Sequence, residues 1–136
     1  MIPSDLHAGV DTSVLMRLLT GLPEKQFELA LDQMKETTSL GKRLLVSNLV
    51  VCEAYYACQH HYKMPKQDVL LGLHRLLSHP TFSVEDGLLD LLSQGGLASA
   101  KPGFIDRLIH LEYTKARTGL ISFEKSAKKL PKTKIL

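Results

Sequence analysis

The order of apolar and polar positions divides the chain into short apolar runs and longer segments of helical period. The runs with the length and composition of strands are residues 6–10, 44–46, 81–84, 120–123 and, as an edge strand, 132–136. Helices are predicted where apolar residues recur at three- and four-residue spacing, over residues 13–19, 23–40, 49–61, 65–78 and 102–118, with a shorter capped segment at 85–92.

Strands that alternate with helices of this length imply a parallel sheet covered by helices on both faces. We therefore expect one α/β domain spanning residues 1–136, a three-layer α/β/α sandwich with a central parallel sheet of four or five strands. Right-handed crossovers place all strand carboxyl ends at one edge of the sheet, and open α/β sheets bind their ligands at that edge.

Composition is that of a soluble globular protein, with 44% hydrophobic and 23% charged residues among 136. No apolar run approaches the roughly 20 residues of a membrane-spanning helix, and the first five residues lack a secretory pattern. Cys52 and Cys58 are too few for a disulfide framework, and with His60 and His61 they match no closed zinc spacing. We expect a cytoplasmic protein without membrane contact.

Charge is distributed unevenly along the chain. Residues 1–100 carry 8 basic and 11 acidic side chains, whereas residues 101–136 carry 9 basic and 3 acidic ones. The basic end is either a solvated tail or a surface that attracts a polyanion.

Four acids fall where the predicted strands end or where helices leave that edge. Asp11 follows the first strand and Glu124 the strand at 120–123, while Glu53 and Asp106 lie in the first turns of two helices. Taken singly, Asp11 can also be a helix N-cap, and Asp106 and Glu124 can be surface acids. The apolar and aromatic neighbours of Glu53 favour a functional role for it.

Four carboxylates in one cleft would repel one another unless a cation lay among them. Ligation by oxygen alone suits Mg²⁺ or Mn²⁺, and such a cation can lower the pKa of a water and neutralise charge in phosphodiester hydrolysis. The acids therefore predict a metal-dependent nuclease site.

The chain resembles the PIN-domain family, in particular the VapC-type ribonuclease toxins of bacterial toxin–antitoxin pairs. The resemblance rests on four stretches in order, at residues 10–15, 46–55, 104–109 and 121–125. It implies a Mg²⁺- or Mn²⁺-dependent endoribonuclease, a homodimer, and an antitoxin that covers the site. It makes Asp11, Glu53 and Asp106 the core catalytic and metal-binding residues, joined by Glu124, with Ser13 and Ser122 as polar neighbours.

The sequence departs from the family pattern at two positions. Glu124 stands where the family usually has aspartate, and Gly103 stands where another acid is frequent. A glutamate carries its carboxylate one methylene further, which alters a site that needs near-octahedral geometry. A degenerate PIN domain that binds RNA or a protein partner is therefore the alternative.

The resemblance also suggests a role for the basic residues 101–136. Arg107, Lys125, Lys128 and Lys129 are predicted to hold RNA phosphates. The aromatic residues that can stack on bases are Tyr55, Tyr56 and Phe123. A phosphate-binding switch of receiver type is a third hypothesis, but it needs an acidic pair beside the first strand, which offers only Asp11.

Overall fold

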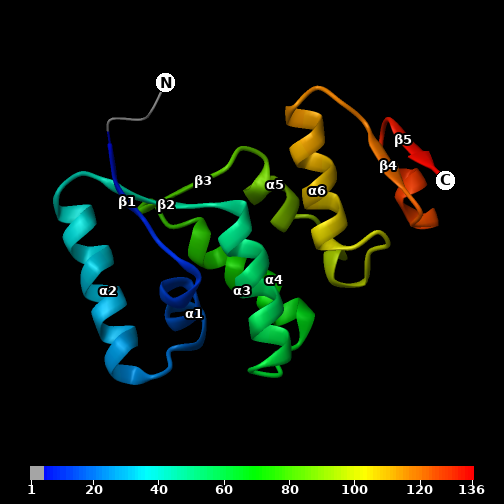
Figure 1. Ribbon diagram of the computed structural model, residues 1–136. Helices are drawn as coiled ribbons and strands as arrows, with labels where there is room; N and C mark the ends of the chain where they lie inside the picture. The colour runs from blue at the N-terminus through cyan, green and yellow to red at the C-terminus, as the bar shows by residue number, and fades with distance from the viewer. Residues whose placement is uncertain (1–4) are drawn as a thin grey trace. The chain divides into compact units, whose positions relative to one another are not determined.

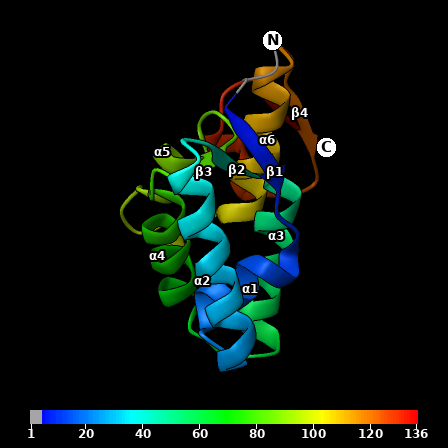
Figure 2. The ribbon, with the colours of Figure 1, turned by 90° about the vertical axis from the view of Figure 1, so that its left-hand side faces the viewer.

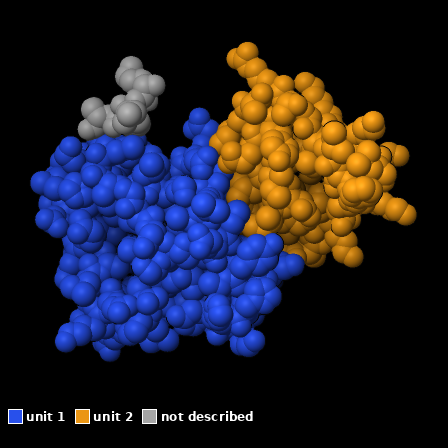
Figure 3. Space-filling model, in the orientation of Figure 1, with its two compact units in different colours: residues 1–89 blue, residues 90–136 orange. Residues whose placement is uncertain are grey.

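The computed structural model describes residues 5–136, and the chain separates into two compact units, residues 1–89 and residues 90–136 (Figure 3). The boundary falls within a short helix. The expectation of one domain over residues 1–136 stays a prediction. Residues 1–4 lie outside the described residues. The observation that the first five residues lack a secretory pattern therefore concerns mostly residues that the structure does not describe.

Unit 1 is built on a parallel three-stranded sheet in the order β1-β2-β3 (Figure 1). The strands are β1 (Leu6–Gly9), β2 (Arg43–Val46) and β3 (Phe82–Val84). The first two are also joined at their start, where Arg43 Nε donates to Asp5 Oδ2 at 2.6 Å. The predicted α/β class with a parallel sheet is confirmed.

Two pairs of helices connect these strands: α1 (Thr12–Thr20) and α2 (Glu24–Ser39) precede β2, while α3 (Asn48–His60) and α4 (Lys66–Leu77) precede β3. Helix α1 packs against α2, α3 and α4 (Figures 1 and 2). The fully buried aliphatic side chains come from the sheet and from the inner faces of these helices, and they include Leu15, Val46, Val51, Val69, Leu73 and Leu77.

Unit 2 contains the two remaining strands. Helix α5 (Leu88–Leu92) crosses the boundary, and it is followed by η1 (Leu97–Ser99) and α6 (Phe104–Lys115). Strands β4 (Leu120–Ser122) and β5 (Thr133–Ile135) pair in parallel around η2 (Lys125–Lys129). His110 on α6 donates from Nε2 to the carbonyl of Pro131 at 2.7 Å, which ties the helix to the segment before β5.

The predicted elements are all present, with shifted ends. Helix α6 begins at Phe104, two residues after Pro102, because Gly103 is its N-cap. It ends at Lys115 because Arg117 adopts a left-handed φ of 61°. The capped segment at 85–92 is helical only from Leu88. The five strands form two parallel sheets, of three and two strands, within residues 5–136.

No helix within residues 5–136 is both long enough and apolar enough to span a membrane. The cytoplasmic location expected from the sequence stays a prediction.

Candidate functional site

Asp11 lies two residues beyond the end of β1 and caps α1. Its Oδ1 accepts hydrogen bonds from the Ser13 hydroxyl at 2.6 Å and from the Val14 amide at 3.3 Å. The Ser13 hydroxyl is the main reason that the pKa of Asp11 is below the ordinary 3.8, and the Val14 amide adds to the effect. The carboxylate is exposed and ionised at neutral pH. Its capping role leaves Oδ2 for a ligand, since both bonds to described residues use Oδ1.

A cavity of about 620 Å³ opens beside this carboxylate. It lies among β1, α1 and α2 within unit 1, and its polar lining includes Asp11, Ser13, Arg17, Gln26 and Gln33. Arg17 is held toward Gln26, its Nε donating to Oε1 at 2.5 Å. Cavities of this size are typical of small-ligand sites, so Asp11 borders space large enough for a nucleotide.

Glu53 lies in the second turn of α3. The helix starts where Ser47 accepts a hydrogen bond from the Val50 amide at 3.3 Å. Val51 and Ala54 on either side of Glu53 are fully buried, while Glu53 itself is exposed. The apolar neighbours that favoured a functional role are thus explained by the helical period, which turns them toward the core. The Glu53 carboxylate itself faces solvent.

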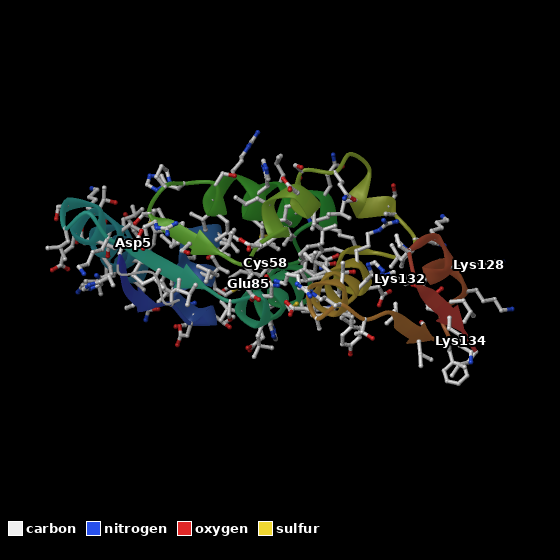
Figure 4. All side chains as sticks on the ribbon, turned by 90° about the horizontal axis from the view of Figure 1, so that it is seen from above. Asp5, Cys58, Glu85, Lys128, Lys132 and Lys134 are labelled. Atoms are coloured by element: carbon white, nitrogen blue, oxygen red, sulfur yellow. The ribbon has the colours of Figure 1, made fainter. Side chains whose placement is uncertain are left out.

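Glu85 is a strand-end acid that the sequence analysis assigned only to a capped segment. It follows β3 directly, and its Oε2 accepts from the Asn48 amide at the start of α3 at 2.5 Å (Figure 4). A carboxylate at a helix N-terminus is stabilising. Its position after a strand, like that of Asp11, was the signal that could have identified it.

Asp106 is exposed in the first turn of α6. No side chain caps this helix, because its N-cap is Gly103. The neighbouring Arg107 donates from Nε to the carbonyl of Pro102 at 2.7 Å, so its guanidinium is held at the start of the helix.

Glu124 follows β4 and caps η2. Its Oε1 accepts from the Ser126 hydroxyl at 2.9 Å and the Ser126 amide at 3.2 Å. These bonds, the hydroxyl first, lower the pKa of Glu124 below its ordinary value. The Ser122 hydroxyl accepts from the Glu124 amide at 2.9 Å, so Ser122 adjoins this acid as expected.

The four predicted acids belong to both units. Asp11 and Glu53 lie in unit 1, and Asp106 and Glu124 lie in unit 2. Within neither unit, over residues 5–136, do three or more His, Cys, Asp or Glu side chains gather as a metal site would require. The meeting of the four carboxylates therefore stays a prediction.

The predicted phosphate-binding lysines are exposed on and near η2. Lys129 donates to the carbonyl of Lys101 at 3.1 Å. Lys125 and Lys128 make no ion pair with the described carboxylates. Two further exposed lysines, Lys132 and Lys134, follow η2 along the chain in unit 2 (Figure 4).

The three aromatic residues proposed for stacking differ in exposure. Tyr55 is only 4% exposed and belongs to the core, with a pKa raised by burial. Tyr56 is 49% exposed and Phe123 is 80% exposed. Of these three rings, only those of Tyr56 and Phe123 are exposed enough to be reached by a base, and base stacking stays a prediction.

The two thiols differ in burial. Cys58 is buried, its Sγ lies 3.7 Å from the Met16 sulfur, and burial raises the pKa of its thiol. Cys52 is half-buried, while His60 is exposed. These residues have separate environments, and no metal-binding group is found among them within the described part of the chain.

Comparison with known proteins finds one informative similarity. Over 76 residues the chain is 32% identical to a VapC ribonuclease of Aquifex aeolicus strain VF5. That stretch covers 56% of this chain and 56% of the relative, so the chain spans little more than half of the relative's length. No family model matches the chain, and no solved structure matches it.

Proposed function

We propose that this protein is a PIN-type, VapC-like endoribonuclease that depends on Mg²⁺ or Mn²⁺. The observation that carries the proposal is the 32% identity to a VapC ribonuclease over 76 residues. The α/β fold, with an exposed acid shortly after β1 and another after β4, supports it. The substrate class is RNA.

The residues that would hold the cation are Asp11, Glu53, Asp106 and Glu124. Their donor atoms are all carboxylate oxygens, the type that Mg²⁺ and Mn²⁺ prefer, so the chemistry of the donors suits such an ion. When bound, the cation supplies charge neutralisation at the scissile phosphate and lowers the pKa of water there.

The chain's own residues prepare two of these acids. Ser13 orients the Asp11 carboxylate and lowers its pKa, and Ser126 does the same for Glu124. Arg107, Lys125, Lys128 and Lys129 would bind phosphates of the RNA backbone, which positions the substrate without reading its sequence.

The same proposal includes a partner protein, an oligomeric state and a cellular location. An antitoxin protein would cover the acidic site, the chain would act as a homodimer, and the protein would work in the cytoplasm. These features accompany the VapC resemblance, and each has its own measurement, namely copurification, light scattering and fractionation.

The test is cleavage of a structured RNA by purified protein in Mg²⁺ or Mn²⁺, with a chelator in a parallel reaction. Asp11→Asn should reduce cleavage at least a hundredfold, about 3 kcal/mol of transition-state stabilisation. Asparagine caps helices nearly as well as aspartate, so α1 should remain folded.

Asp32→Asn is the matched control, because Asp32 is also exposed, on α2, but does not line the cavity beside Asp11. It should cleave as the parent protein does. Metal-stimulated cleavage that survives in Asp11→Asn would reject the assignment.

A catalytically degenerate module that binds RNA or protein is the second candidate. It is favoured by Gly103 at a position where the family often has an acid, and by the commitment of the Glu124 carboxylate to Ser126. Calorimetry with Mn²⁺ separates the two candidates. A ribonuclease should release or absorb heat that disappears in Asp11→Asn, while a pure binding module should show none.

A further inference from the structure

The outward face of α3 carries aromatic side chains that the proposed cleavage chemistry does not use. The ring of Tyr56, 49% exposed, lies nearly parallel to the exposed His60 imidazole, with centroids 6.1 Å apart and 15° between the planes. Tyr55 meets Tyr56 edge-on, with centroids 5.6 Å apart and 66° between the planes. The Tyr56 ring is thus held by two neighbours while much of it faces solvent.

The chain just beyond this ring pair is locally basic. Residues 54–67 contain Lys63, Lys66 and two histidines and no acid, although residues 1–89 as a whole carry 8 basic and 10 acidic side chains. Both lysines are exposed, and neither pairs with a carboxylate in the part of the chain that the structure describes. Most exposed residues from His60 to Gln67 are polar or charged, the exceptions being Tyr62 and Pro65, and this composition disfavours an apolar protein partner.

We propose that the surface formed by the end of α3, the loop after it and the start of α4, from Tyr56 to Lys66, binds single-stranded RNA. One base stacks on the Tyr56–His60 pair, and the next phosphates contact Lys63 and Lys66. Proteins that bind single-stranded nucleic acid usually combine exposed aromatic rings with cationic side chains, because every base has a π-face and every nucleotide has a phosphate. The fixed ring of Tyr56 reduces the ordering cost of binding.

The choice of RNA as the ligand rests on the proposed function. The position of the Tyr56–His60 pair relative to Glu53 connects the binding surface to the proposed cleavage site. Tyr56 lies on the same exposed helix face, about 4.5 Å further along the axis, and His60 about 10.5 Å further. A base held at Tyr56 therefore keeps a neighbouring phosphodiester within reach of Glu53. Duplex RNA, whose bases are already stacked, does not offer that base.

The experiment measures binding apart from cleavage. Fluorescence anisotropy of a labelled single-stranded RNA is recorded in chelator, with every variant built in the Asp11→Asn background. Tyr56→Ala should weaken binding about tenfold, and Tyr56→Phe should stay within about twofold because it keeps the ring. Lys63→Ala and Lys66→Ala should each lower the slope of log affinity against log salt by about 0.7.

Tyr113→Ala is the matched control, a tyrosine of similar exposure, 45%, on α6. It should bind as the parent does, and circular dichroism of each variant checks folding. Unchanged binding by Tyr56→Ala, an equal loss in Tyr113→Ala, or equal affinity for a duplex of the same sequence overturns the proposal, whatever the cleavage assay shows. Binding that depends on Tyr56 in a protein without metal-stimulated cleavage supports binding at this surface and rejects the ribonuclease.

Discussion

At the scale of single residues, Asp11 combines two roles that the sequence presented as alternatives. One carboxylate oxygen caps α1 through Val14 and receives the Ser13 hydroxyl, and the other is left for a ligand. Helix capping and cation binding are compatible here, because a carboxylate has two oxygens and about four acceptor positions. The hydroxyl of Ser13 also has a measurable electrostatic effect, because it stabilises the ionised form.

Ser13→Ala should raise the pKa of Asp11 toward the ordinary 3.8, since the first-ranked cause of its lowering is removed. An aspartate whose folded pKa is lowered stabilises the fold above its unfolded pKa, and this contribution is lost as pH falls through the folded pKa. The variant should therefore be less stable than the parent at neutral pH, and this difference should disappear as pH falls through the folded pKa of the parent's Asp11. Carboxyl-carbon NMR titration measures the shift.

Ser99→Ala provides the comparison, because that hydroxyl donates to the Gly96 carbonyl in unit 2. Its Asp11 should titrate as in the parent protein. An unshifted Asp11 in Ser13→Ala would mean that the hydroxyl bond does not persist in solution.

At the scale of elements, the pairing of β4 with β5 depends on a glycine. A Cβ at Gly119 would overlap the carbonyl oxygen of Lys132, and that same oxygen accepts the Leu120 amide at 3.0 Å. Only a residue without a side chain lets the two segments approach closely enough to start the parallel ladder. The parallel pairing of β4 with β5 therefore depends on Gly119.

Gly119→Ala should lower the free energy of unfolding by about 1–3 kcal/mol, the usual cost of forcing an atom into occupied space. Urea denaturation followed by circular dichroism measures the change. Gly95→Ala is the control in the same unit, since a Cβ there meets nothing within 4 Å and its φ is not left-handed. Equal stability of the two variants would contradict the close approach.

At the scale of the whole molecule, the two units differ in charge. Residues 1–89 carry 8 basic and 10 acidic side chains, and residues 90–136 carry 9 basic and 4 acidic ones. The predicted acids are divided between them. The phosphate-binding side chains predicted from the sequence, Arg107, Lys125, Lys128 and Lys129, all belong to unit 2. A polyanionic substrate would meet its strongest attraction on unit 2, and this attraction is weakened by salt.

The proposed homodimer is a prediction for the whole molecule. Light scattering of the purified protein should give twice the 15.1 kDa mass of one chain, and dilution should reveal its dissociation. A mass of one chain at all concentrations would remove the dimer from the proposal.

The sequence by itself determined the succession of strands and longer helices. It also placed Asp11 and Asp106 beside helix starts and Glu124 after a strand. Apolar period and capping act over a few neighbouring residues, so they can be read directly from the order of residues. Comparison with a VapC ribonuclease over 76 residues then supported the family resemblance.

Only the tertiary structure decided which neighbours face solvent and which distant residues meet. It buried Tyr55 and exposed Tyr56, and it brought Glu85 to the amide of Asn48, 37 residues away. It also divided five strands into sheets of three and two. These outcomes depend on packing between segments far apart in the chain, and local patterns do not specify that packing.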